Sequence, residues 1–325
     1  MKRRDFLQMG MGSIAAAVVA GRAGAQGSYP DRAIKIIVPR PAGGIVDIIA
    51  REWSGKVSKT LGTTYIENMG GGGGVIGAAA AARAPADGYT LLIGTTSELV
   101  ISPLLNQLNY DPVTSFEPVA IMCDSPAAIV VHPSLPVSNL KELVEYAKKN
   151  AGKLNYGSAG AGTVSNLAGE LFKVVAGLPD IVHVPYKGGA PAISDAIAGQ
   201  VPISTPMISE QLWELHKQGK LKVLAVAADR RLSALPDLPT AAEQGYPDLL
   251  ARLFFGLFAP AKTPKPIIAK LEQVTKAALQ DPELKKVLEA GGVQVLDTID
   301  SAAAADYVAK EVTRWKPILA QFKPQ

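Results

Sequence analysis

A run of five glycines is the first feature of the sequence that suggests chemistry. Within residues 67–84, ENMGGGGGVIGAAAAARA, Gly72, Gly74 and Gly77 have the G-x-G-x-x-G spacing of a dinucleotide-binding loop. Such a loop follows the first strand of its domain, and an acidic residue lies about 20 positions further on, at the end of the next strand. Here the run follows the second predicted strand, and Glu98 lies beyond the end of the next one. The pattern therefore favours a flexible crossing with close backbone approach over a nucleotide site.

The loop after the first predicted strand is a stronger candidate for binding. In VPRPAGGIVDIIAR (38–51), prolines stiffen the loop, Gly43 and Gly44 follow, and Asp47 lies at a helix start. Glycines leave backbone N–H groups open to a small anion, and the helix N-terminus adds the positive end of its dipole. Asp47 either belongs to this site or only caps its own helix, because aspartate is a favoured N-cap residue.

A second loop offers the same chemistry. The stretch YGSAGAGTVSNLAGELF (156–172) places serine, threonine and glycine residues around another predicted helix start. Two such helix starts, facing each other across a cleft, would bind a carboxylate without a Lys or Arg at the centre. We therefore predict a small organic acid as the ligand.

Catalytic and metal sites find little support in the sequence. No G-x-S-x-G elbow is present, and Glu98 with Asp47 is the remaining candidate for an acid pair. The lone Cys123 follows an apolar run, which favours an inert core thiol over a reactive one. The three histidines are far apart, so zinc chemistry has no cluster to start from. We predict no catalytic residue, metal or cofactor, and keep a secreted α/β enzyme with a nucleotide cofactor as the alternative.

The first 25 residues have the pattern of an export signal. A basic start leads into an apolar stretch over 14–20, and Ala-Gly-Ala at 23–25 fits a cleavage site near Ala25. Arg-Arg-Asp-Phe-Leu at 3–7 also fits the twin-arginine type. We therefore predict a periplasmic protein. Cleavage there would remove four basic residues and one acidic residue and leave a net charge of about +1. This charge does not indicate the basic surface expected of a nucleic-acid-binding protein.

Short apolar runs alternate with longer helical patterns along the rest of the chain. Predicted strands lie at 33–39, 63–68, 89–95, 127–133, 220–228 and 254–260 and at the starts of 153–177 and 180–188. Predicted helices lie at 47–61, 75–84, 138–150 with Ser138 as N-cap, the end of 153–177, 190–200, 264–281, 282–292 and 301–322. This alternation indicates an α/β chain with mostly parallel sheets. Two similar strand–loop–helix units roughly 120 residues apart suggest two similar domains, each presenting a ligand loop at the C-terminal ends of its strands.

Residues 30–325 resemble the Bug family of extracytoplasmic solute receptors, which are related to the tricarboxylate-transport binding protein. The resemblance is carried by VPRPAGGIVDIIAR, GAAAAARAPADGYTLLIGT, LNYGSAGAGTVSNLAGELF, IVHVPYKGGAPAISDAIAGQV, GKLKVLAVAADRRLSALPDLPTAAEQGYP and FFGLFAPAKTPKPIIAKL, in this order. It implies a type II periplasmic binding protein fold, in which two Rossmann-like domains close on an organic acid. We expect one domain over 26–125 plus 229–325 and the other over 126–228. The resemblance further implies a monomer that works with membrane transporter subunits or a sensor kinase.

The same resemblance implies the ligand-binding residues. They come from the loop after the first strand, the loop after the third strand, the second-domain loop and the VPYKG stretch. The expected contacts are Arg40, Ala42, Gly43, Gly44, Ile45, Val46, Asp47, Thr95, Thr96, Ser97, Ser158, Ala159, Gly162, Thr163, Val164, Ser165, Tyr186, Lys187, Thr205 and Phe254. Lys187 either attracts anions or is a solvated lysine at the rim.

Several departures from the family pattern fall in these loops. Aliphatic side chains replace hydroxyls at Ile45, Val46 and Val164, and Arg40 stands where an apolar residue is common. The usual THAINP is replaced by ELVISP at 98–103. We therefore predict a ligand with more apolar body than citrate, such as an aromatic or aliphatic mono- or dicarboxylate.

Overall fold

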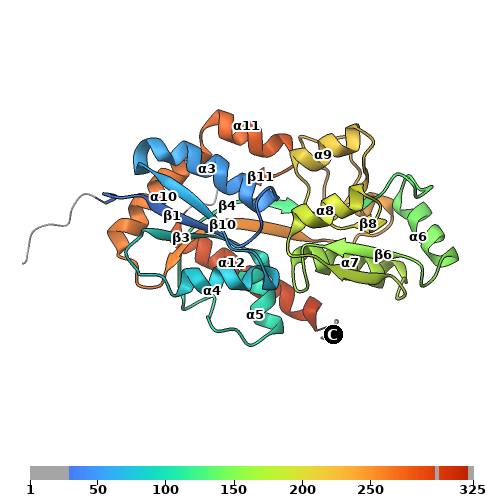
Figure 1. The fold of residues 1–325 in the computed structure, drawn as a ribbon, viewed down its shortest axis with the longest axis horizontal. Coiled ribbons are helices and arrows are strands. Elements are labelled where there is room, and N and C mark those ends of the chain that lie inside the picture. The colour runs from blue at the N-terminus through green and yellow to red at the C-terminus, as the bar shows by residue number, and fades with distance from the viewer. Residues whose placement is uncertain (1–28, 297–299, 321–325) are drawn as a thin grey trace, which may run out of the picture. The chain divides into compact units, whose positions relative to one another are not determined.

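The computed structural model describes residues 29–296 and 300–320 (Figure 1). The predicted export signal lies outside the described residues. The chain after Arg32 forms one unit, which is described below. Among the described residues, no helix has both the length and the apolar character that a membrane span requires.

The first of two sheets has six strands in the order β11-β4-β10-β3-β1-β2. Its strands are β1 (Ile34–Val38), β2 (Thr64–Asn68), β3 (Thr90–Thr95), β4 (Phe116–Pro126), β10 (Arg252–Pro260) and β11 (Gln294–Val295). β1 and β3 are almost wholly buried, as expected for mostly apolar strands in a sheet with helices on both faces. β1 pairs in parallel with β2 and with β3, so the loops after β1 and β3 leave the same edge of the sheet.

The second sheet has five strands in the order β7-β6-β8-β5-β9. They are β5 (Ala128–Val131), β6 (Asn155–Ser158), β7 (Val182–Pro185), β8 (Ile203–Ser204) and β9 (Lys222–Val226). β6 pairs in parallel with β7 and β8, so the loop after β6 and the loop after β7 also share one edge.

Helices surround both sheets (Figure 1). Those of the six-stranded sheet are α3 (Ile45–Leu61), α4 (Val75–Ala82), α5 (Ser102–Leu105), α10 (Lys265–Leu279), α11 (Pro282–Ala290) and α12 (Ser301–Leu319), with the 3-10 turn η2 (Gly72–Gly74) and the π-helical turn η3 (Ser97–Ile101). Those of the five-stranded sheet are α6 (Leu140–Lys149), α7 (Val164–Ala176), α8 (Gly189–Ile197) and α9 (Glu210–Lys217), and the 3-10 turn η4 (Ala242–Gln244) lies between β9 and β10. Asn139 caps α6 by accepting a hydrogen bond from the backbone N–H of Glu142 at 2.9 Å, so the predicted N-cap at Ser138 was wrong by one residue.

Both sheets are mixed, so the prediction of mostly parallel sheets was right only in part. β10 runs antiparallel to both β3 and β4, and β5 runs antiparallel to both β8 and β9. The whole second sheet lies between β4 and β10 along the chain. The direction of β10 is therefore set by pairing with strands far away in sequence, which the local alternation of strands and helices does not reveal. The sequence reading also missed β4, whose apolar residues around Cys123 were assigned only to the core.

The chain passes between the two sheets at the end of β4 and again before β10. Leu232, Leu235 and Leu238 lie in one hydrophobic cluster with Ala128 and Val130 of the second sheet. This packing associates the segment after β9 with the second domain. The domain boundary predicted at 228 stays a prediction. These core contacts favour a boundary closer to β10.

The lone Cys123 lies in the core of the six-stranded sheet. It is 0% exposed, and burial raises the pKa of its thiol well above the ordinary value. Because the thiolate is the reactive form, this environment agrees with the interpretation as an inert core residue.

Candidate functional site

One cavity of about 50 Å³ is lined by both predicted anion-binding loops and by the loop after β3. Nine of the expected contact residues line it: Arg40, Gly43, Gly44, Ile45, Val46, Ser97, Ala159, Thr163 and Ser165. Eight further lining residues were not expected from the sequence: Pro41, Gly189, Ile193, Pro206, Met207, Ser209, Gln211 and Leu253. The loops after β1 and β6 therefore share a cavity, as a site built from both domains requires.

The start of α3 keeps its first-turn donors available. Its N-cap is Gly44, and no side chain caps it. Asp47 instead turns back, accepting from the backbone N–H of Gly43 at 3.0 Å and from Arg51 Nε at 2.9 Å. Because the first N–H groups of a helix have no partner within the helix, those of α3 are free to bind an anion beside the cavity.

Asp47 supports this loop and does not line the cavity. Besides Gly43 and Arg51, it accepts a hydrogen bond from Asn68 Nδ2 at 2.9 Å. Burial alone would raise the pKa of Asp47, but the hydrogen bonds from Arg51, Gly43 and Asn68 hold it below the ordinary value. The carboxylate is thus ionised and occupied by its neighbours, which leaves it the role of fixing the loop.

The start of α7 is hydrogen-bonded largely within the protein. Thr163 is its N-cap and accepts from the backbone N–H of Asn166 at 3.2 Å. The N–H of Val164 donates to Ser97 Oγ at 3.3 Å, so the loop after β3 supplies the acceptor for the first N–H of a helix in the other domain. Ser165 Oγ accepts from the N–H of Ala159 at 3.1 Å. This helix start therefore shapes the cavity wall more than it offers unbound donors.

An ion pair between Arg40 and Glu98 lies buried beside the cavity. Arg40 Nη2 is 3.0 Å from Glu98 Oε2, and the side chains are 6% and 0% exposed. Thr95 donates its hydroxyl to the same carboxylate at 2.7 Å. Burial raises the pKa of Glu98, while Arg40 and the hydrogen bonds from Thr95 act in the opposite direction. Glu98 and Asp47 each pair with their own arginine, so the acid pair considered for an enzyme does not form.

The glycine run makes room for this ion pair and for the opposite domain. A Cβ on Gly74 would collide with Arg40 Nη1 and come within 2.6 Å of Glu98 Oε2. A Cβ on Gly73 would lie 3.0 Å from the carbonyl oxygen of Ala161. Both glycines have positive φ, 101° and 64°. Close packing and left-handed backbone therefore account for the glycines that resembled a nucleotide loop.

The remaining expected residues do not line the cavity: Ala42, Asp47, Thr95, Thr96, Ser158, Gly162, Val164, Tyr186, Lys187, Thr205 and Phe254. Several of them make hydrogen bonds within the protein. Thr205 Oγ1 donates to the carbonyl of Ser165 at 2.6 Å, and Tyr186 donates its hydroxyl to Asp195 at 2.7 Å. Lys187 is exposed, in agreement with a lysine at the rim.

Most lining residues that the sequence reading missed lie beside residues it identified. Gly189 directly follows the VPYKG stretch, and Leu253 directly precedes Phe254. Pro206 and Met207 follow Thr205 on the chain. Ile193, Ser209 and Gln211 come from α8 and the start of α9, and no motif marked them.

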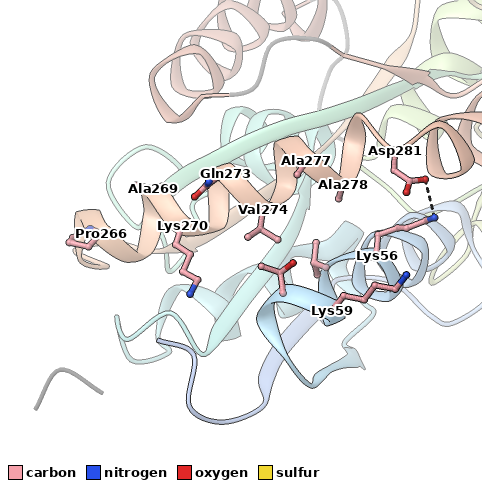
Figure 2. Close-up of a pocket in the computed structure, with 12 residues that line it drawn as sticks. Lys56, Lys59, Pro266, Ala269, Lys270, Gln273, Val274, Ala277, Ala278 and Asp281 are labelled. Carbon is pink, nitrogen blue, oxygen red and sulfur yellow. Dashed lines mark ion pairs between the residues drawn. The ribbon is translucent and has the colours of Figure 1, made fainter. Parts of the chain in front are cut away.

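A larger groove of about 670 Å³ lies between α3 and α10 (Figure 2). Lys56 on its wall pairs with Asp281 at 2.9 Å and with Glu283 at 2.7 Å. None of the expected contact residues lines this groove, and its lining comes only from residues 56–60 and 266–281. Among the described residues, no group of three His, Cys, Asp or Glu side chains is arranged to hold a metal ion.

Comparison with known proteins gives consistent matches over nearly the whole chain. A family model described as "Tripartite tricarboxylate transporter family receptor" matches residues 49–323. The solved periplasmic binding protein BugD is 36% identical to this chain, with a TM-score of 0.86 and coverage of 90% of this chain and 98% of its own.

Two further solved structures contain carboxylates. MatC from Rhodopseudomonas palustris with bound malate is 32% identical, with a TM-score of 0.84, and the match covers 90% of this chain and 100% of that protein. Another R. palustris protein, solved with adipate, is also 32% identical, with a TM-score of 0.86, and the match covers 90% and 97% of the two chains. The predicted two-domain α/β binding fold is confirmed by these matches.

Proposed function

Since this chain belongs to the family of tripartite tricarboxylate transporter receptors, we propose that it captures a small organic carboxylate in the cavity between its two domains. The observation that carries the proposal is that Gly43–Val46 of one domain and Ala159, Thr163 and Ser165 of the other line the same cavity. The uncapped start of α3 presents backbone donors there, which suits a carboxylate group.

The cavity lining supports a ligand with a more apolar body than citrate. Its side chains include Ile45, Val46, Ile193, Met207 and Leu253. Apolar walls favour an apolar ligand body, because removing the apolar surfaces of both from water lowers the free energy. Malate and adipate are the ligands of two similar proteins, and adipate has the longer apolar chain.

The charge of the lining supports a ligand with few negative charges. Among the described residues that line the cavity, Arg40 alone is charged, and Glu98 neutralises it at 3.0 Å. Within the described lining no unpaired cation is available to a third carboxylate, and leaving such a group desolvated without a partner is costly. We place aliphatic and aromatic mono- and dicarboxylates ahead of tricarboxylates.

A thermal-shift screen followed by titration calorimetry tests the proposal. Adipate, benzoate, malate, citrate and NAD are each added to the mature protein. A ligand that binds only the folded form raises its stability by RT ln(1 + [L]/Kd), about 2.7 kcal/mol at 100 times Kd. We expect binding of an aliphatic or aromatic acid without its consumption. Tight binding of citrate with no heat from the apolar acids would contradict the ligand class, and a shift with NAD alone would favour the enzyme alternative.

We further propose that the receptor acts in the periplasm and delivers the acid to membrane transporter subunits, with a sensor kinase as the alternative partner. The support is the family, whose members are receptors of tripartite transporters. Deletion of the gene distinguishes the transport role from the sensing role. Loss of uptake of the labelled acid indicates transport, whereas loss of transcriptional induction with normal uptake indicates sensing.

A further inference from the structure

Ser97 makes a polar bridge between the two domains at the cavity wall. Its Oγ accepts a hydrogen bond from the backbone N–H of Val164 at 3.3 Å. Ser97 begins the turn after β3, and Val164 is the first residue of α7. A helix leaves this N–H without an internal acceptor, so a side chain of the opposite domain completes the cap. Ser97 is 1% exposed, which shields the bond from competition by bulk water.

The position of Ser97 is set by Glu98 through Thr95. Glu98 accepts both the backbone N–H and the hydroxyl of Thr95. Because the hydroxyl proton of Thr95 points to Glu98, its oxygen is free to accept from the N–H of Ser97 at 3.3 Å. Arg40 compensates the charge of the buried carboxylate at 3.0 Å. A continuous set of hydrogen bonds therefore runs from the loop after β1 to the start of α7.

The backbone packs tightly beside this bridge. Gly73 approaches the carbonyl of Ala161 so closely that a Cβ on the glycine would lie 3.0 Å from its oxygen. A Cβ on Gly160 would lie 4.0 Å from the Cα of Gly73. The two domains thus approach closely through backbone atoms of Gly73, Gly160 and Ala161, and the hydrogen bond from Val164 to Ser97 adds a polar contact.

We propose that Ser97 and Glu98 are positioning residues for ligand capture: Glu98, neutralised by Arg40, orients Ser97 to cap α7 of the opposite domain and so favours the closed arrangement before any ligand binds. The inference rests on the proposed function because closure is taken as the ligand-holding state. Glu98 falls in the stretch ELVISP, where this sequence departs from the family pattern. The effect is one of pre-organisation, since domains that are already closed lose less freedom when the ligand binds.

Distance measurement between two spin labels in the ligand-free protein tests the proposal. Lys59 on α3 and Ser194 on α8 are exposed, and each is replaced by cysteine for labelling. The native Cys123 is 0% exposed and stays unlabelled. We expect a closed population in the parent protein, and a closed-to-open ratio about 2- to 10-fold lower in Ser97→Ala, the size of one hydrogen bond. Glu98→Gln should lower the ratio in the same direction.

Ser54→Ala is the matched control. Ser54 Oγ is 2.5 Å from Thr64 Oγ1 within one domain, so its loss removes a buried hydroxyl hydrogen bond without touching the other domain. An unchanged distance distribution in Ser97→Ala, an equal shift in Ser54→Ala, or a parent protein that is wholly open would each overturn the proposal. Since no ligand is present, failure of every carboxylate to bind would count against the proposed function and leave this result standing.

Discussion

Arg40 and Glu98 form an ion pair in which both side chains are buried, with Nη2 and Oε2 3.0 Å apart. The two residues are far apart in sequence, and the pair joins the loop after β1 to the turn after β3. Burial removes the hydration of both charges, and their attraction mainly compensates that loss, so the pair adds little net stability. Removal of one partner is therefore more damaging than removal of both.

Glu98→Ala should lower the free energy of unfolding by about 3–5 kcal/mol, because it leaves the Arg40 guanidinium buried without a counter-charge. The double variant Glu98→Ala with Arg40→Met should recover a large part of that loss. Urea denaturation followed by circular dichroism measures both values. Asp306→Asn is the control, since Asp306 and Lys310 pair at the surface with 63% and 76% exposure, and it should cost less than about 1 kcal/mol. Equal losses in the single and double variants would contradict this account.

Gly74→Ala should destabilise the protein more than Gly245→Ala. Both glycines are left-handed, with φ of 101° and 94°, so both substitutions carry a backbone cost of about 1–2 kcal/mol. Only at Gly74 does the new Cβ collide with Arg40 and approach Glu98 within 2.6 Å, whereas at Gly245 it meets nothing within 4 Å. Thermal and urea unfolding measure the difference, which we expect to be about 1–3 kcal/mol from overpacking. Similar losses at both positions would show that steric contact at Gly74 is unimportant.

Ile45→Thr should shift the preference of the receptor away from apolar acids. Ile45 lines the cavity, and loss of apolar surface there weakens burial of a ligand chain by about 1 kcal/mol. The ratio of the adipate Kd to the malate Kd should therefore rise several-fold, as measured by calorimetry. Ile76→Thr changes an isoleucine that is 54% exposed and outside the cavity, and it should leave the ratio unchanged. A ratio that moves equally in both variants would remove Ile45 from the specificity argument.

The sequence predicted the parts of the site that local chemistry determines. Gly43, Gly44 and the start of α3 were identified because a glycine loop before a helix has a known affinity for anions. Ile193 and Gln211 were missed, since a residue on one face of a helix contributes to a cavity only through the packing of that helix. The ion pair of Arg40 was also missed: neither its type nor its spacing indicates which distant residue it meets.

The fold was likewise predicted where local sequence determines it and missed where distant strand pairing does. β1 and β3 were found as short apolar runs, and their loops were placed correctly at one edge of the sheet. The antiparallel course of β10 was missed, because it is set by pairing with β4 over a long sequence separation. The glycine run was predicted to allow close backbone approach, and the structure confirms this. The sequence did not indicate that its neighbours would be Arg40 and Ala161.

Asp47→Asn should make the stability of the protein less sensitive to acid. Burial raises the pKa of Asp47, but the hydrogen bonds from Arg51, Gly43 and Asn68 outweigh it, so the folded-state pKa lies below the ordinary value of 3.8. A group with a depressed folded-state pKa contributes stability that is present above its unfolded pKa and is lost as the pH falls through the folded value. The wild type should therefore lose stability below about pH 4 more steeply than Asp47→Asn, whose amide does not titrate. Urea unfolding at a series of pH values from 7 down to 3 measures the two slopes. Identical slopes would show that this carboxylate gains nothing from its three donors, and the loop would then need another explanation for its fixed shape.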